Sequence, residues 1–283
     1  MQVSKNNILQ GSLNKPIAVD IFYLQNRLPK PVVIYAHGFN GFKDWANFDL
    51  IAKQFAQAGF VFIKFNFSHN GTTPQEPEDF VDLAAYAENN YTKELDDLQL
   101  VINWALNKTN SHAQEINAEK LCLIGHSRGG GIAIIKAAEE KHIMALATWA
   151  SVSECKTPWT NWDATKMQEW KSTGVQYTLN SRTQQQMPLH YQLYENYVQH
   201  AQRLNILKAI SSLSIPILIC HGTKDEAVTL DNAYELQQAN PAAKLFLVIS
   251  DHVFGRKHPF TSQQLPSPMQ QVVDETIIFF QAL

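Results

Sequence analysis

Residues 121–131 of this chain read LCLIGHSRGGG. The apolar run at 121–125 has the length and composition of a buried strand, and it leads directly into a turn rich in glycine. The apolar side chains beyond the turn predict a helix at 129–140. The stretch therefore predicts a strand, a tight turn and a helix, with Ser127 in the turn.

Apolar strands and amphipathic helices alternate along most of the chain. We predict strands at residues 32–36, 61–67, 121–125, 145–150, 217–221 and 245–250, and helices at 45–58, 92–106, 129–140 and 231–239. The N-terminal residues up to Leu24 alternate in polarity around a turn at 14–16 and predict an antiparallel hairpin. This pattern is typical of an α/β protein in which helices flank both faces of a mostly parallel sheet.

One segment, residues 157–209, interrupts the alternation. It contains no strand-like run and is too long for a plain loop, so we expect a mainly helical cap inserted between the core segments 1–156 and 210–283. Its aromatic residues include Trp159, Trp162, Trp170, Tyr177, Tyr191, Tyr194 and Tyr197. These rings must pack against one another, the core or a ligand, and the sequence leaves the three alternatives open. Tryptophans placed over a ligand site would favour apolar or aromatic groups.

The composition limits the classes of function. Hydrophobic residues make up 45% and charged residues 17% of the 283 residues, which is ordinary for a folded globular protein. The net charge of −3 gives no basic surface, so neither nucleic acid nor a membrane is an expected partner. No apolar stretch approaches the roughly 20 residues that span a bilayer, and residues 1–10 do not resemble a secretory signal. We therefore expect a cytoplasmic protein, and its oligomeric state is not predicted.

The cysteines and histidines give no sign of a metal site. Cys122 and Cys220 lie in apolar strands and are predicted to be buried side chains of a reduced protein. Cys155 lies in a polar segment, where an exposed position is also open. Zinc-ligand spacings such as C-x-x-C are absent from the sequence, so we predict neither a metal nor a cofactor.

Ser127 lies in a G-x-S-x-G motif. In a strand–turn–helix setting this motif holds the serine in a strained conformation, with Oγ projecting from the end of the strand. Gly125 and Gly129 are required because a Cβ at either position would collide with the neighbouring strand or helix. A serine hydroxyl is a weak nucleophile at neutral pH, so it also needs a base, a group that orients the base, and donors for an oxyanion.

Two later loops supply candidates for the base and its partner. Asp225 follows the predicted strand at 217–221, and His252 follows the strand at 245–250. Both positions lie beyond the carboxyl ends of strands, where ligands bind in open α/β sheets.

Other residues could take these roles. His258 is an alternative base, and Glu226, Glu154 and Asp163 are alternative acids. We expect three further histidines to brace loops through hydrogen bonds, namely His37, His126 and His221. For the Arg128 side chain we expect a solvated position at the start of a helix rather than contact with an acidic substrate group.

These motifs resemble the α/β-hydrolase family, in particular its esterase and peptidase-like members. The matching blocks are H-G-F at 37–39, G-H-S-x-G at 125–129, H-G-x-x-D at 221–225 and D-H-x-F at 251–254. The order Ser127, Asp225, His252 is also the order of that family's catalytic triad. The resemblance implies an α/β-hydrolase fold and an oxyanion hole made by the backbone N–H groups of Phe39 and Arg128.

For function, the resemblance implies two-step acyl transfer on a small-molecule acyl substrate, without a cofactor. The H-G-F block points to carboxylic esters with small, medium or aromatic acyl groups, including hydroxycinnamoyl esters. A peptidase or amidase on the same fold and a non-catalytic ligand-binding protein remain alternatives.

Overall fold

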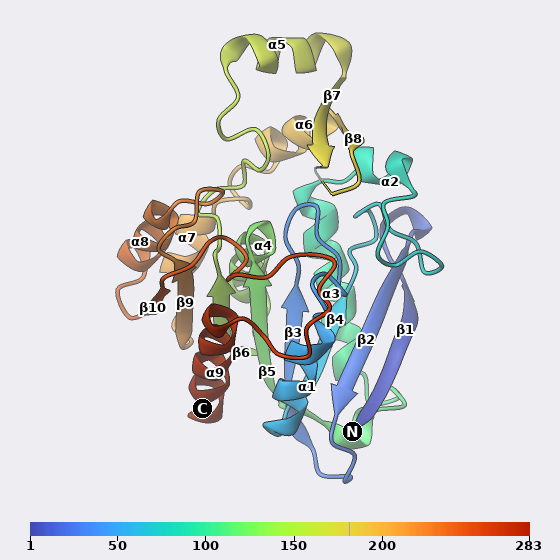
Figure 1. Cartoon of the computed structure of the whole chain (residues 1–283), viewed down its shortest axis with the longest axis vertical. Coiled ribbons are helices and arrows are strands. Elements are labelled where there is room, and N and C mark those ends of the chain that lie inside the picture. Colours follow the sequence, from blue (N-terminus) through green and yellow to red (C-terminus); the bar gives the residue numbers. More distant parts are fainter. Residues whose placement is uncertain (181) are drawn as a thin grey trace.

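Eight strands form one sheet at the centre of the computed structural model, which describes residues 1–180 and 182–283 (Figure 1). The strands are β1 (Gln2–Gln10), β2 (Pro16–Tyr23), β3 (Lys30–Ala36), β4 (Val61–Phe65), β5 (Ile116–His126), β6 (Ile143–Trp149), β9 (Ile217–Gly222) and β10 (Lys244–Val248). Their order is β1-β2-β4-β3-β5-β6-β9-β10; β1 and β2 are antiparallel at one edge, and the strands from β4 to β10 are parallel. The predicted α/β fold and the N-terminal hairpin are confirmed.

Both faces of the sheet are buried, which explains why its inner strands are apolar along most of their length. In β3, Val32 and Ile34 belong to one core layer, and Val33 and Tyr35 belong to the layer on the opposite face. Helices must therefore cover both sides of the sheet.

Two layers of helices provide this cover (Figure 1). One face carries α1 (Asp49–Gln57) and α9 (Ser267–Gln281), and the other carries α3 (Tyr91–Leu106), α4 (Arg128–Glu139), α7 (Ile206–Ser211) and α8 (Leu230–Ala239). A short helix, α2 (Leu83–Ala87), precedes α3, whose first turn is capped by the Asn90 side chain accepting a hydrogen bond from the N–H of Lys93. None of the described helices is long and apolar enough to cross a membrane.

Several helices differ from the sequence prediction, which did not include the short helices α2 and α7. The helix predicted at 45–58 begins only at Asp49, because Ala46 and Asn47 have φ angles of 54° and 53°, which an α-helix does not accommodate. Trp45 is therefore free to line a cavity. The C-terminal helix α9 was not predicted, although its buried side chains recur at helical spacing.

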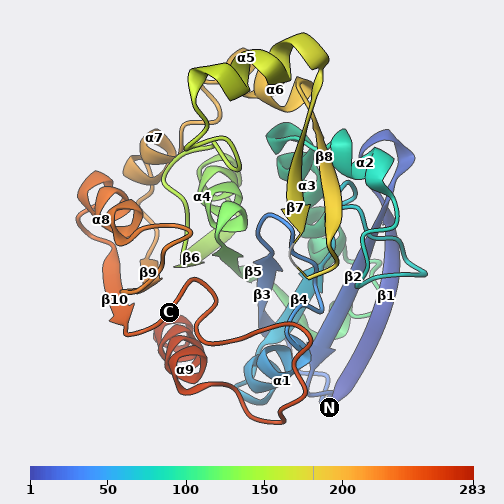
Figure 2. The same ribbon diagram turned by 45° about the horizontal axis from the view of Figure 1, so that its top comes forward.

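The cap stands beyond the carboxyl ends of the parallel strands (Figures 1 and 2). It contains α5 (Ala164–Thr173), β7 (Val175–Asn180), β8 (Gln185–His190) and α6 (Gln192–Gln199). The strands β7 and β8 form an antiparallel hairpin, which the expectation of a mainly helical cap did not include. Gly174, with φ of 76°, ends α5 and turns the chain into β7.

The aromatic residues of the cap pack mainly against one another. Trp159 and Trp170 are 5% and 0% exposed, and their ring centroids lie 5.7 Å apart. Tyr191 meets the Trp170 ring edge to face at 5.4 Å, and the Trp170 indole N–H donates to the carbonyl of Leu189 at 2.7 Å. Of the three alternatives for these rings, the structure favours a small core within the cap.

The turn between β5 and α4 brings three backbone segments into close contact. Ser127 has φ of 56° and ψ of −124°, a conformation that L-residues rarely adopt. A Cβ on Gly125 would lie 2.2 Å from the carbonyl oxygen of Gly129, and a Cβ on Gly129 would lie 2.3 Å from that of His37. Both glycines are therefore required by the backbone, as the sequence predicts.

We expect Gly129→Ala to destabilise the protein by about 2–3 kcal/mol, because the added methyl meets backbone atoms that cannot move aside. Gly174→Ala is the matched control: its position has a positive φ but no atom within 4 Å of the added Cβ, so about 1 kcal/mol is expected. Urea unfolding of both variants measures the difference. Equal losses of stability would contradict the close contact described here.

Candidate active site

The candidate catalytic residues lie at the carboxyl ends of three parallel strands. Ser127 follows β5, Asp225 follows β9, and His252 follows β10. The structure brings the last two into direct contact, with His252 Nδ1 2.7 Å from Asp225 Oδ2. A buried carboxylate in this position fixes the orientation and the tautomer of the imidazole, which leaves Nε2 as the reactive nitrogen.

The Asp225 carboxylate is held on both oxygens. Its Oδ1 accepts hydrogen bonds from the N–H groups of Ala227 and Val228, at 2.9 and 2.8 Å. His221 Nε2 lies 3.4 Å from Oδ2 and donates to the carbonyl of Val228 at 2.8 Å. Burial alone would raise the pKa of Asp225, but the contacts with His221 and His252 outweigh it and hold the pKa below its usual range. Asp225 is therefore ionised at neutral pH.

Ser127 and His252 line the same two cavities. In the part of the chain that the structure describes, no hydrogen bond joins the serine hydroxyl to the histidine. Such contacts are often long in enzymes without substrate and tighten when substrate binds. The arrangement is thus a serine beside a histidine that is already fixed by a carboxylate.

Two backbone N–H groups next to the serine have no partner among the described residues, those of Phe39 and Arg128. Arg128 is the first residue of α4, where helical N–H groups lack intrahelical acceptors. The loop that carries Phe39 is held close, because a Cβ on Gly38 would lie only 2.9 Å from Cβ of Ser127. Both amides are available to an anionic oxygen at this point.

His37 braces the Phe39 loop. Its Nδ1 donates to the carbonyl of Gly38 at 2.9 Å, and its Nε2 accepts from the N–H of Phe67 at 3.3 Å. Burial lowers the pKa of His37 to about 4, so the ring is neutral and can make both bonds. His126 similarly donates from Nε2 to the carbonyl of His252 at 3.0 Å. Together with His221, these histidines brace loops as the sequence indicates.

The alternative candidates lie elsewhere. His258 accepts a hydrogen bond at Nδ1 from the N–H of Ala46 and packs on the Phe42 ring, away from Asp225. Glu226 and Glu154 line a cavity beside the serine, and Asp163 caps the first turn of α5. None of these acids forms an ion pair with a histidine in the described part of the chain.

The predicted solvated position of the Arg128 side chain was wrong. The side chain is only 2% exposed, and its Nε donates to the Glu94 carboxylate on α3 at 2.9 Å. The guanidinium also stacks 3.9 Å from the Tyr91 ring centroid and donates to the carbonyl of Thr157 at 3.3 Å. No local signal could have revealed this, because all three partners are remote in sequence. Arg128 thus links the turn at Ser127 to α3 and to the base of the cap.

Ser127 separates two cavities of different character. The first, called here the small pocket, has a volume of about 170 Å³, and its walls include Tyr35, Phe39, Phe42, Trp45 and Arg256. The second, called the large cleft, has a volume of about 690 Å³ and runs along residues 152–161 and 226–235. Its described lining residues do not include Trp159, Trp162 or Trp170, which does not support the idea that the cap tryptophans hold the substrate.

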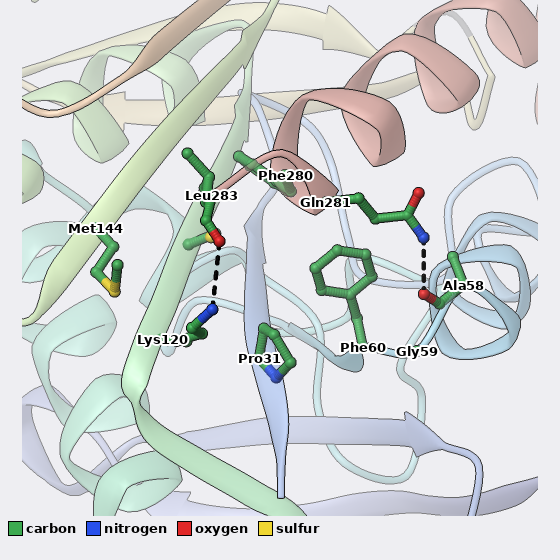
Figure 3. Close-up of a pocket in the computed structure, with 10 residues that line it drawn as sticks. Pro31, Ala58, Gly59, Phe60, Lys120, Met144, Phe280, Gln281 and Leu283 are labelled. Carbon is green, nitrogen blue, oxygen red and sulfur yellow. Dashed lines mark hydrogen bonds between the residues drawn. The ribbon is translucent and has the colours of Figure 1, made fainter.

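A third cavity lies at the opposite end of the sheet (Figure 3). It is closed partly by the C-terminus, where Lys120 Nζ donates to the carbonyl of Leu283 at 3.2 Å. Its one thiol is Cys122, whose pKa is raised to about 12 by burial, so it is not a nucleophile at neutral pH. Cys220 is also buried, as predicted, and so is Cys155, for which an exposed position had been left open.

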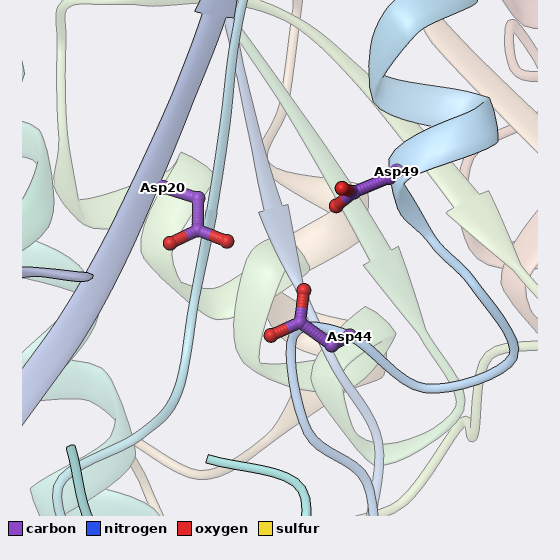
Figure 4. A group of neighbouring side chains, drawn as sticks. All are labelled: Asp20, Asp44 and Asp49. Atoms are coloured by element: carbon purple, nitrogen blue, oxygen red, sulfur yellow. The ribbon is translucent and has the colours of Figure 1, made fainter. Parts of the chain in front are cut away.

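Three carboxylates lie close together, those of Asp20, Asp44 and Asp49 (Figure 4). Three lysines balance their charge. Lys43 contacts Asp20 and Asp44, at 2.7 and 2.5 Å, Lys64 contacts Asp44 and Asp49, and the partly exposed Lys5 contacts Asp49 at 2.7 Å. Burial would raise the pKa of Asp44, but the ammonium groups of Lys64 and Lys43 lower it to about 2. The cluster is therefore a buried ion-pair network, and the lysines occupy the position that a metal ion would need.

Comparison with known proteins bears on this arrangement. A model of the BD-FAE family matches residues 19–239. Among solved structures, the chain is similar to the alpha/beta hydrolase GrgF from Penicillium sp. sh18, with a TM-score of 0.71 and 14% identity, over 100% of this chain and 99% of that one. It is similar to Est1E from Butyrivibrio proteoclasticus with ferulic acid bound, with a TM-score of 0.68 and 17% identity, over 99% of this chain and 100% of that one.

The fold also occurs in a peptidase. The acylaminoacyl peptidase of Pyrococcus horikoshii matches with a TM-score of 0.64 and 11% identity, over 99% of this chain but 42% of that one. No curated protein sequence matches significantly. At these identities the solved structures establish the α/β-hydrolase fold.

We expect Lys64→Met to destabilise the protein by about 3–5 kcal/mol, because it leaves buried carboxylates without their counter-charge. Lys156→Met removes a lysine from an exposed pair with Glu154 and should change stability by less than about 1 kcal/mol. Chemical denaturation at pH 7 compares the two variants. Similar small effects would mean that Lys64 is not needed to balance the charge of these carboxylates.

Proposed function

Because this chain belongs to the BD-FAE family and has the α/β-hydrolase fold, we propose that it is a serine esterase that cleaves carboxylic esters through Ser127, His252 and Asp225. The observation that carries the proposal is the 2.7 Å contact between His252 Nδ1 and the ionised Asp225 carboxylate. His252 lines the same pocket as Ser127. Two unpartnered N–H groups at the same place, those of Phe39 and Arg128, support the proposal.

The first half of the reaction forms an acyl-enzyme. His252 Nε2 takes the proton from the Ser127 hydroxyl as Oγ attacks the ester carbonyl carbon. The resulting oxyanion accepts hydrogen bonds from the N–H groups of Phe39 and Arg128, which are fixed before the reaction and need no reorganisation. The C–O bond to the alcohol then breaks, and the alcohol leaves with the proton that His252 returns.

The second half releases the acid. A water molecule gives a proton to His252 and attacks the acyl carbon, the same two amides stabilise the second oxyanion, and Ser127 regains its proton as the ester bond to the enzyme breaks. Asp225 stays ionised throughout and stabilises the imidazolium that forms twice in the cycle. Atoms and charges balance without a metal or a cofactor.

The two cavities support a division of the ester into two halves. The small pocket accommodates a short or medium acyl group against aromatic walls, and the large cleft can receive and release the alcohol. The structure of Est1E contains bound ferulic acid. Hydroxycinnamoyl esters are therefore a second acyl class to test.

We expect the wild-type protein to react with a fluorophosphonate probe and Ser127→Ala to remain unlabelled. His252→Gln should abolish labelling, whereas His258→Gln should keep it, which separates the two histidines by the same chemical change. Asp225→Asn should lower kcat by about four orders of magnitude, because the imidazole then adopts the wrong tautomer. A wild-type protein that resists the probe would contradict the proposal, as would loss of labelling in His258→Gln with retention in His252→Gln.

A substrate panel separates the esterase from a peptidase. We expect hydrolysis of p-nitrophenyl acetate and butyrate and of methyl ferulate, with no detectable release from aminoacyl p-nitroanilides. The Ser127→Ala variant is the blank for each substrate. Preferential cleavage of the anilides would instead identify an amidase on the same fold.

A further inference from the structure

Arg256 places a buried positive charge on the wall of the small pocket. Its side chain is 4% exposed, and it lines the pocket together with Ser127 and His252. Its Nε donates to the carbonyl of Val253 at 3.1 Å, whereas its Nη1 is buried and has no hydrogen-bond partner. A buried donor without an acceptor is rare in folded proteins.

Arg256 differs from the other buried cations of the described chain. Those side chains are Lys30, Lys43, Lys64, Arg128 and Lys136, and each forms an ion pair with a carboxylate. Arg256 has no carboxylate within ion-pair distance among the described residues. A buried charge without a partner is costly, so an acceptor is expected when the site is in use.

The surroundings of Arg256 compensate the charge only in part. The Trp45 and Phe48 rings lie 5.3 and 5.5 Å from its guanidinium carbon, which gives a weak cation–π attraction. Asp251 attracts it at longer range, but the Asp251 carboxylate accepts hydrogen bonds from the N–H groups of Val253 and Gly255. Burial outweighs these attractions and lowers the pKa of the Arg256 guanidinium below its ordinary value.

Tyr35 offers a second donor on the same wall. It is 4% exposed and lines the small pocket, and its ring stacks on Phe48 with centroids 3.9 Å apart. Its hydroxyl makes no hydrogen bond to any described residue. The unpartnered Nη1 of Arg256 and the unpartnered hydroxyl of Tyr35 match the needs of a carboxylate, which accepts several hydrogen bonds at once.

We propose that the small pocket binds an acyl group ending in a carboxylate, held by Arg256 and Tyr35, so that the preferred substrates are monoesters of short dicarboxylic acids. This inference rests on the proposed esterase function and names the acyl class of the same site. The anionic end of the acyl chain supplies the counter-charge that Arg256 lacks.

The charge of the large cleft supports this orientation. Its lining carries four carboxylates, those of Glu154, Glu226, Asp231 and Glu235, and no lysine or arginine among the described lining residues. These carboxylates would repel an anionic group from the cleft. The carboxylate of the substrate therefore belongs in the small pocket, and an uncharged or cationic alcohol belongs in the large cleft.

The test compares monomethyl succinate with dimethyl succinate, which share the acyl chain and the leaving group and differ in the charge at the far end. For wild-type protein at pH 7.5 we expect kcat/KM for the monoester to exceed that for the diester by roughly tenfold or more, as for a charge-assisted hydrogen bond. In Arg256→Gln the ratio should fall by roughly 10- to 100-fold, and Arg256→Lys, which keeps the charge, should retain more of it than Arg256→Gln. Arg203→Gln, at a surface pair with Glu139, is the matched control and should leave the ratio unchanged.

The outcomes separate this inference from the proposed esterase function. Hydrolysis of p-nitrophenyl butyrate and labelling by the fluorophosphonate report the esterase alone. If these succeed while wild-type protein shows no preference for the monoester, the inference is wrong and the esterase stands. If Arg256→Gln lowers kcat/KM for both succinate esters by the same factor, Arg256 has only a packing role and the inference is again wrong. The wild-type ratio decides the matter even if the variants fail to fold.

Discussion

The start of α4 lies against the ends of β3 and β5 at a separation that leaves room for backbone atoms alone. A Cβ at Gly125 or Gly129 would lie within 2.2 or 2.3 Å of a carbonyl oxygen, so the missing side chains let the helix begin directly behind the strand. Ser127 is consequently held at a positive φ, and Arg128 follows it as the first residue of α4. The Ser127 hydroxyl and the backbone amides of Phe39 and Arg128 share one location because Gly125 and Gly129 have no side chains.

Buried charge organises the region around this turn in two ways. Lys5, Lys43 and Lys64 are matched by the carboxylates of Asp20, Asp44 and Asp49, and in α4 Arg128 is matched by Glu94. These pairs make fixed supports, since breaking either one would leave a charge without a partner in a medium of low polarity. Arg256 lacks such a match, so one buried charge on the wall of the small pocket has no carboxylate partner among the described residues.

Sequence patterns predicted the structural features that depend on residues close together along the chain. Strand periodicity, the glycines around Ser127, and the placement of Asp225 and His252 after their strands are all local signals, and the structure brings Asp225 and His252 into contact. Contacts between distant segments left no such signal. The Arg128 side chain is buried because its carboxylate partner lies 34 residues earlier on α3. The β7–β8 hairpin is a different case: its strands contain no continuous apolar run, but the strict alternation of VQYTLN in β7 is a local strand signal that the prediction overlooked.

Thr157 connects the cap to the turn that carries Ser127. The Tyr91 hydroxyl donates to the carbonyl of Thr157 and accepts from its N–H, at 3.1 and 2.9 Å, and Arg128 donates to the same carbonyl. Thr157 also forms part of the wall of the large cleft. An alcohol group bulky enough to displace this wall would therefore loosen the guanidinium and, through it, the first turn of α4. Discrimination among alcohols would then be expressed in the rate of acyl transfer as well as in affinity.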